Sequence, residues 1–148
     1  MEVARGLTSE DWPHATTRLA AAALATRARG RVLDVGTGDG VLARAALAAG
    51  ARAVVGIDRA PVPTVAGADL RQVAVEDFHG VFDVVVANLP EDVLLREVGR
   101  LLAMAPEAIL TGVRLPRVAA LAARIRAAGG RVAELRALDG WGLVIAHA

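Results

Sequence analysis

The sequence has 148 residues, of which 55% are hydrophobic and 22% are charged, and it contains no cysteine. This composition is typical of one globular domain, and the lack of cysteine excludes a disulfide scaffold, thiolate metal sites and a cysteine nucleophile. The 17 basic and 16 acidic residues nearly cancel and aromatic residues make up only 3%, which argues against nucleic acid as a partner. Charges or glycines interrupt every apolar run before the ~20 residues of a membrane span, and the first residues lack a signal-peptide pattern. We therefore expect a cytoplasmic protein without a membrane partner.

Short apolar runs alternate along the chain with stretches rich in strong helix formers, after an irregular segment over residues 1–13. Helices are expected from a Thr16-Thr17 cap to about Arg29, and over residues 41–49, 91–103 and 116–128. Strands are expected over residues 31–35, 53–57, 72–75, 82–87, 108–113, 131–137 and 141–146. The prolines and the glycine between the second and third strands leave room for a very short helix at most.

This alternation predicts a Rossmann-like α/β fold with a mostly parallel, seven-stranded sheet. The last two strands are separated only by Leu138-Asp139-Gly140, which is too short for a crossover. They therefore form an antiparallel hairpin, and the last strand is the antiparallel exception in the sheet. We expect residues 1–148 to form a single domain.

A glycine-rich turn, Gly36-Thr37-Gly38-Asp39-Gly40, follows the first strand. Ligands of parallel α/β sheets bind at the carboxyl ends of the strands, where glycines allow close approach and the next helix offers free N–H groups. The third glycine comes one residue too early for a dinucleotide fingerprint, and a chain without lysine cannot contain a phosphate-binding P-loop. The sequence from Asp34 to Gly40 instead resembles motif I of the S-adenosylmethionine (SAM)-dependent methyltransferases.

Asp58 ends the second strand, where its carboxylate can accept hydrogen bonds from both hydroxyls of a ribose. The alternative is that Asp58 caps a turn, as aspartates at strand ends often do.

Asn88 ends the fourth strand and is followed by Leu89-Pro90, a pattern that resembles motif IV of amino-group methyltransferases. An amide oxygen at that place can accept an N–H bond and aim the lone pair of a neutral amine at a methyl group, so that catalysis is mainly positioning. The alternative is that Asn88 only begins the turn before the next helix.

Several segments together resemble the ribosomal protein L-eleven methyltransferases (PrmA type). The most specific are His14-Ala15-Thr16-Thr17-Arg18-Leu19-Ala20 and the run from Val85 to Leu89. Residues 33–43, 109–112, 130–131 and 140–141 are also similar, so the resemblance covers nearly the whole chain from His14 onward.

The resemblance implies a class I SAM-dependent methyltransferase fold that uses SAM and releases S-adenosyl-L-homocysteine. It implies that the cofactor site comprises Thr17, Asp34, Gly36, Gly38, Gly40, Asp58 and Asn88, with Asn88 also the catalytic residue. Without the resemblance, Thr17 is a plain helix cap.

Other residues are assigned less specifically. Glu76 or Asp77 could meet the adenine side, and Trp141 is either core packing or near the substrate. His14, His79 and His147 have no metal-ligand spacing and are expected to be exposed or in turns.

The chain also departs from the family pattern. The family carries an N-terminal domain that recognises the ribosomal protein, whereas about a dozen residues precede His14 here. The segment after Asp58 is too short and proline-rich for the helix that normally helps to cover the adenine. In Asn88-Leu89-Pro90-Glu91 the proline is unusual for this family; rRNA adenine dimethyltransferases have a similar Asn-Leu-Pro, but with an aromatic residue where Glu91 stands.

The leading hypothesis is a SAM-dependent N-methyltransferase that acts on an amino group of a protein, with a ribosomal protein as the candidate acceptor. The alternatives are a SAM-binding module with little or no turnover, and a methyltransferase for RNA or for a small molecule. The sequence leaves the acceptor and the oligomeric state open.

Overall fold

A computed structural model describes residues 13–148 of the chain, so the irregular segment expected at residues 1–13 lies outside the described residues except for Pro13. The seven strands are β1 (Arg31–Val35), β2 (Ala53–Asp58), β3 (Ala68–Gln72), β4 (Val84–Asn88), β5 (Glu107–Arg114), β6 (Arg131–Leu138) and β7 (Trp141–His147). The helices are α1 (Ala15–Arg27), α2 (Val41–Ala48), α3 (Glu91–Met104) and α4 (Val118–Ala127), with short 3-10 turns η2 (Val75–Asp77) and η3 (Leu115–Arg117).

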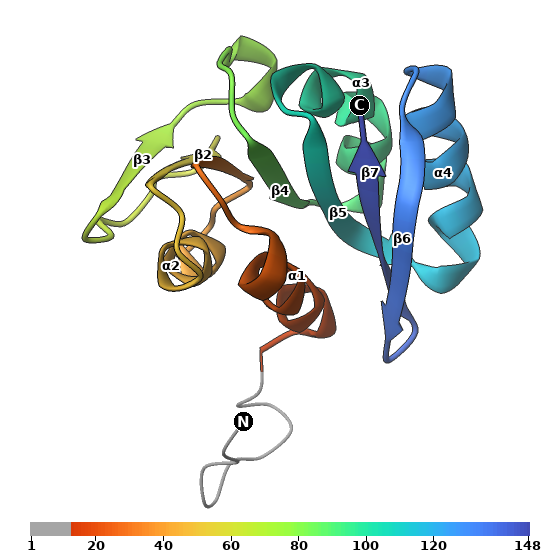
Figure 1. Ribbon diagram of the computed structural model, residues 1–148, viewed down its shortest axis with the longest axis horizontal. Helices are drawn as coiled ribbons and strands as arrows, with labels where there is room; N and C mark the ends of the chain where they lie inside the picture. Colours follow the sequence, from red (N-terminus) through yellow and green to blue (C-terminus); the bar gives the residue numbers. More distant parts are fainter. Residues whose placement is uncertain (1–12) are drawn as a thin grey trace, which may run out of the picture.

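The strands form one sheet in the order β3-β2-β1-β4-β5-β7-β6 (Figure 1). The first five strands pair in parallel, while β7 lies between β5 and β6 and is antiparallel to both. The predicted fold class, with its mostly parallel sheet and antiparallel last strand, is confirmed. The strand order reverses between β1 and β4, which is where such sheets bind their ligands.

The central strands are buried on both faces, and successive side chains enter two different cores. Val32, Val84 and Val86 join the core that contains the apolar residues of α1 and α2. Leu33 and Val85 join the core that contains the apolar residues of α3 and α4. Two helices on each face therefore cover the sheet, which explains why the runs for β1 and β4 are almost continuously apolar. No helix among residues 13–148 is both long and apolar enough to cross a membrane.

The third strand lies at residues 68–72, so its predicted position at 72–75 is wrong. Ala68 pairs with Val54 and Gln72 with Asp58, after which Val75 turns into η2 and is buried. β3 is an edge strand with largely exposed side chains, so it lacks the apolar run that marks the other strands. The expectation for the preceding segment is met, because residues 59–67 contain no helix.

The cap of the first helix also differs from the prediction. His14, not Thr16-Thr17, is the N-cap residue, and its Nδ1 accepts a hydrogen bond from the backbone N–H of Thr16 at 3.2 Å. The Thr16 hydroxyl lies 2.8 Å from the same nitrogen. Both threonines consequently lie in the first turn of α1, and the Thr17 side chain does not serve as the cap.

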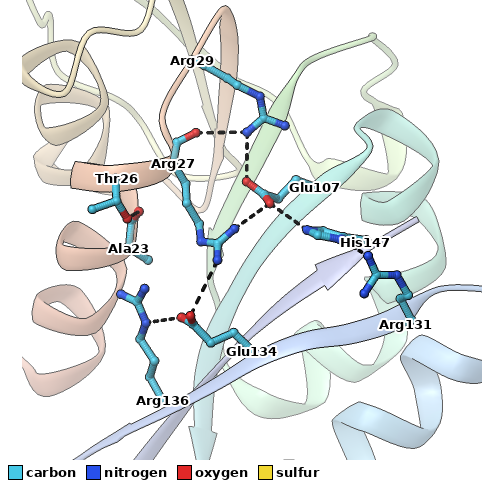
Figure 2. Close-up of polar contacts among 9 residues, drawn as sticks. All are labelled: Ala23, Thr26, Arg27, Arg29, Glu107, Arg131, Glu134, Arg136 and His147. Atoms are coloured by element: carbon cyan, nitrogen blue, oxygen red, sulfur yellow. Dashed lines mark hydrogen bonds and ion pairs between the residues drawn. The ribbon is translucent and has the colours of Figure 1, made fainter.

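A buried carboxylate at the amino end of β5 ties three elements together (Figure 2). Glu107 is only 5% exposed and accepts hydrogen bonds from Arg27 at 2.8 Å, Arg29 at 3.0 Å and His147 at 2.8 Å. Arg131 also bonds to His147 Nδ1; because an arginine only donates, Nε2 carries the proton that is donated to Glu107. These bonds fix the end of α1 and the end of β7 to β5. His147 is therefore half-buried in a polar network, and the expectation that it is exposed or in a turn is wrong.

Glu107 should make stability depend on pH in a defined direction. Burial alone raises the pKa of its carboxyl, but the hydrogen bonds from His147 and Arg29 and the charges of Arg27 and Arg29 outweigh burial, so the pKa lies below its usual value. A carboxyl whose pKa is lower in the folded state stabilises the fold above its unfolded pKa. That contribution is lost as the pH falls through the folded pKa.

We expect Glu107→Gln to lower the free energy of unfolding by about 1–3 kcal/mol at pH 7, because the partly exposed Arg27 and the half-exposed Arg29 lose the buried carboxylate that accepts their hydrogen bonds. Urea denaturation at pH 7 and at decreasing pH measures the difference from wild type, which should shrink in acid. Asp69→Asn is the control: it breaks an exposed pair with Arg71, a kind of pair worth about 0–1 kcal/mol. Equal losses in the two variants would contradict the role given to Glu107.

Candidate functional site

The turn between β1 and α2 is built on glycines in the left-handed region. Gly36, Gly38 and Gly40 have φ values of 75°, 54° and 85°, which favour residues without a Cβ. The backbone N–H groups of Gly36 and Thr37 both donate to the carbonyl of Ile57 at 2.9 Å, which fixes the turn to the end of β2. A Cβ on Gly36 would lie 2.6 Å from Leu89 Cδ2 and 3.2 Å from the carbonyl oxygen of Asn88. The turn therefore lies directly against the end of β4.

Asp58 holds this turn from the end of β2. Its Oδ2 accepts a hydrogen bond from the backbone N–H of Gly38 at 2.9 Å, and its Oδ1 accepts one from Ala60 at 2.9 Å. A carboxylate has about four lone-pair sites, so both oxygens can still accept a bond from a ligand. Asp58 is only partly buried and lines a cleft.

Asn88 and Thr17 meet across the carboxyl edge of the sheet. Asn88 Nδ2 lies 3.5 Å from Thr17 Oγ1, to which it donates, although the two residues are far apart in sequence. The backbone N–H of Leu89 donates to the carbonyl of Thr111 at 3.2 Å and so fixes the chain after Asn88 to β5. α1, β4 and β5 thus converge on one point.

Three clefts meet at Asn88. The first, which we call the apolar cleft, has a volume of about 330 Å³. It is lined by Val35, Gly36, Ile57, Asp58, Arg59, Val73, Ala74, Val75, Asn88, Leu89, Pro90 and Val93. The polar cleft, of about 430 Å³, is lined by Pro13, His14, Thr17, Gly36, Thr37, Gly38, Asp39, Val41, Leu42 and Asn88. The outer cleft, of about 250 Å³, is lined by His14, Thr16, Asn88, Leu89, Pro90, Gly112 and Trp141.

Most of the predicted site residues lie on these clefts. Gly36 and Asn88 line both the apolar and the polar cleft, Thr17 and Gly38 line the polar cleft, and Asp58 lines the apolar cleft. Asp34, near the end of β1, and Gly40, the last residue of the turn, line none of the three clefts, and both are buried. Glu76 and Asp77 also lie off the apolar cleft, where Val73, Ala74 and Val75 occupy the wall.

Asp34 supports the turn from inside the protein. It is fully buried, and its Oδ2 accepts a hydrogen bond from the Thr37 hydroxyl at 2.7 Å. Oδ1 has no hydrogen-bond partner within residues 13–148. Burial, helped by the nearby charges of Asp58 and Asp39 and opposed by the bond from Thr37, raises the pKa of Asp34 to about 7.

We expect stability to fall as the pH rises from about 4 towards 7, because the folded state favours the protonated form of Asp34 in that range. Asp34→Asn is neutral at every pH, so it should gain stability relative to wild type as the pH rises from about 4 to about 7, and the difference should level off above pH 7. Urea denaturation of both proteins between pH 5 and 8 measures this difference. Asp92→Asn, an exposed change on α3 that does not contribute to the pKa of Asp34, is the control; a pH-independent difference for Asp34→Asn would contradict the assignment.

Gly112 lets β5 come close to the segment after Asn88. The register of β5 against β7 shifts between Thr111 and Val113, and Gly112 in this bulge has a φ of 114°. A Cβ on Gly112 would lie 1.7 Å from the carbonyl oxygen of Leu89. No side chain fits there unless the backbone moves.

Gly112→Ala should therefore lower the free energy of unfolding by more than the about 1–3 kcal/mol that backbone strain alone costs. Gly50→Ala is a matched control, since Gly50 has a φ of 101° and nothing within 4 Å of an added Cβ. Thermal and urea denaturation of both variants compares their free energies of unfolding. Equal losses would show that the contact with Leu89 is unimportant.

Two residues at the outer cleft have more defined positions than the sequence predicts. His14 and Trp141 form an edge-to-face pair with ring centroids 4.8 Å apart, and Arg114 lies over the Trp141 ring at 4.4 Å. His14 is exposed, as expected, yet it lines both the polar and the outer cleft. Trp141 lines the outer cleft and also packs against the core that contains the apolar residues of α1 and α2, so both readings of Trp141 stay open. Among the described residues, no group of three or more histidines and acids could hold a metal ion.

Comparison with known proteins gives consistent matches. The sequence profile of the family described as "Ribosomal protein L11 methyltransferase (PrmA)" matches residues 12–147. A ribosomal protein L11 methyltransferase of Geobacter sulfurreducens is 39% identical over 133 residues, which are 80% of this chain and 44% of that protein. The chain thus spans less than half the length of this curated relative.

Solved structures share the fold. A ribosomal protein L11 methylase from Lactobacillus delbrueckii subsp. bulgaricus superposes with a TM-score of 0.79 at 21% identity, covering 91% of this chain and 79% of that one. A magnesium protoporphyrin IX methyltransferase from Synechocystis with bound SAM gives 0.69 at 17% identity, covering 89% of this chain and 77% of that one.

Proposed function

The chain belongs to the ribosomal protein L11 methyltransferase (PrmA) family, and from that premise we propose that it is a SAM-dependent N-methyltransferase acting on an amino group of a protein. One observation carries the proposal: Asn88 lies where the apolar, polar and outer clefts meet. A residue at that point can contact both a cofactor and an acceptor. We further propose that residues 1–148 form one methyltransferase domain.

The two inner clefts suit the two ends of SAM. The apolar cleft has mainly aliphatic walls for a purine and the Asp58 carboxylate for a ribose. The polar cleft has backbone groups of the glycine turn and the hydroxyl of Thr17 for an amino acid end. The clefts adjoin at Gly36, where a Cβ would collide with Leu89. The residues present therefore fit SAM, although Asp34 and Gly40 would act by supporting the turn rather than by contact.

SAM, when bound, supplies a methyl group on a positively charged sulfur. Asn88 Nδ2 is directed to Thr17, which leaves Oδ1 as the acceptor for an N–H of the substrate amine. This bond and the walls of the outer cleft would aim the nitrogen lone pair at the methyl carbon. Asn88 and the outer cleft would thus hold the amine for transfer of the methyl group that SAM would supply, and one N–H proton of the methylated nitrogen would leave to water.

The acceptor that we propose is a ribosomal protein, because the relatives that match over most of this chain are ribosomal protein L11 methyltransferases. Ribosomal proteins are made in the cytoplasm, so the enzyme would act there. A nucleic acid acceptor is a weaker candidate, because Glu91, which cannot stack on a base, follows Pro90 and is paired with Arg117 at 3.1 Å.

One observation favours a second candidate function. Residues 59–67 contain no helix that could cover the apolar cleft. If this opening weakens binding too far, the protein is a SAM-binding module with little or no turnover.

Asp58→Ala should weaken the binding of S-adenosylhomocysteine at least about tenfold, because it removes charged hydrogen-bond acceptors for the ribose. Isothermal titration measures this affinity, with Asp69→Ala, an exposed acid on β3 off the three clefts, as the control. Wild-type affinity in Asp58→Ala would remove the ribose assignment.

Asn88→Ala should lower kcat by roughly 100-fold, the scale of a misplaced reacting group, with a smaller effect on cofactor affinity. Transfer of a labelled methyl group from SAM to the protein and RNA fractions of a cell extract measures turnover and acceptor class together. Label in protein, lost in Asn88→Ala, supports the proposal; label in RNA would overturn the acceptor, and binding without any transfer would favour the second candidate.

A further inference from the structure

We propose that Arg59, which lines the apolar cleft, is a positioning residue for the adenine end of the cofactor, and that its ion pair with Glu76, outside the cleft lining, holds it there. The inference rests on the proposed function, because it assigns a role within the same site. It concerns the side of the cleft where the chain between β2 and β3 is short.

The need for such a residue follows from the chain after Asp58. β2 ends at Asp58 and β3 begins at Ala68, and the residues between them include Pro61 and Pro63 and form no helix. No helix from this segment can therefore pack over Val73, Ala74 and Val75, which line the cleft. Arg59, the first residue of the segment, also lines the cleft.

Arg59 is fixed at both ends. Its backbone carbonyl accepts a hydrogen bond from Gln72 Nε2 at 3.0 Å, at the end of β3. Its side chain Nη2 donates to Glu76 Oε1 at 3.1 Å, on the η2 turn. The side chain therefore spans from the end of β2 to the turn that follows β3, beside the cleft wall formed by Val73–Val75.

Glu76 is itself held from α3. Arg96 Nη2 lies 3.8 Å from the same Oε1, and Arg96 Nε donates to Glu97 at 3.2 Å. The backbone N–H of Glu76 and the charges of Arg59 and Arg96 lower the pKa of its carboxyl. Glu76 is therefore ionised at neutral pH, and the ion pair links β2, η2 and α3 around the cleft.

The chemistry of Arg59 suits a purine. A guanidinium is planar and delocalised, and it stacks on aromatic rings, while the arginine stem offers methylene groups to an apolar surface. No aromatic side chain is among the residues that line the apolar cleft. Arg59 thus supplies a planar group among mainly aliphatic lining residues. Because the pair with Glu76 already restricts the rotamers of Arg59, less side-chain freedom is lost when the cofactor binds.

Two ligands separate the adenine end from the methionine end: S-adenosylhomocysteine, and 5′-methylthioadenosine, which lacks the amino acid part. Isothermal titration of the full chain should show that Arg59→Ala weakens both by a similar factor, about 3–10-fold. Arg59→Lys keeps the pair with Glu76 and should recover part of the loss. Glu76→Gln should weaken both ligands about 2–5-fold at low salt, and less in 1 M NaCl.

Arg71→Ala is the matched control, because it breaks an exposed arginine–aspartate pair on β3 that lines none of the clefts. It should bind both ligands like the wild type. Wild-type affinity in Arg59→Ala, or a loss confined to S-adenosylhomocysteine, would overturn the inference, as would a Glu76→Gln variant identical to wild type at low salt. Failure of the wild type to bind either ligand is a different result, because it would overturn the proposed function itself.

Discussion

The structure depends on one steric constraint: the backbone of β5 comes so close to the segment after β4 that no Cβ fits at Gly112. Gly36 faces the carbonyl of Asn88, and Gly112 faces the carbonyl of Leu89. The segment from Asn88 to Leu89 is thus held between two glycines on neighbouring strands. Because the contact at Gly112 is with backbone atoms of Leu89, the position of the segment after Asn88 does not rely on flexible side chains on that side. The three clefts meet there for this reason.

Polar groups secure this arrangement from both ends of the sheet. At the site end, Asp58 accepts from the glycine turn and Asp34 holds Thr37 from below. At the opposite end, Glu107 binds Arg27 at the end of α1 and His147 at the end of β7. α1 carries His14 and Thr17 at its other end, and β7 begins with Trp141. The ion network therefore fixes the elements whose far ends form the walls of the polar and outer clefts.

The sequence was sufficient for those parts of the protein that a repeating pattern controls. β1 and β4 are buried on both faces, so their residues are continuously apolar, and their carboxyl ends share one edge; Gly36 and Asn88 could be placed together on that basis. β3 was misplaced because Leu70 is the only large apolar residue in an edge strand. The contact between His14 and Trp141 depends on the pairing of β7 with β5. This is a long-range arrangement that no local sequence pattern indicates. Asp34 is part of the sequence that resembles motif I, but it is fully buried and therefore does not line a cleft.

The insertion of β7 between β5 and β6 has a consequence for how the molecule is assembled. An interior position of the sheet is filled by a segment that is synthesised after all the other strands. Until β7 docks, β5 presents an open edge, and the outer cleft lacks Trp141. Such pairing of distant segments is slow to form, because the loop-closure entropy is lost before the contacts are made. The wall of the outer cleft that Trp141 supplies thus depends on the pairing of β7 with β5, and a polypeptide interrupted before residue 141 would contain the glycine turn but lack a finished place for an acceptor.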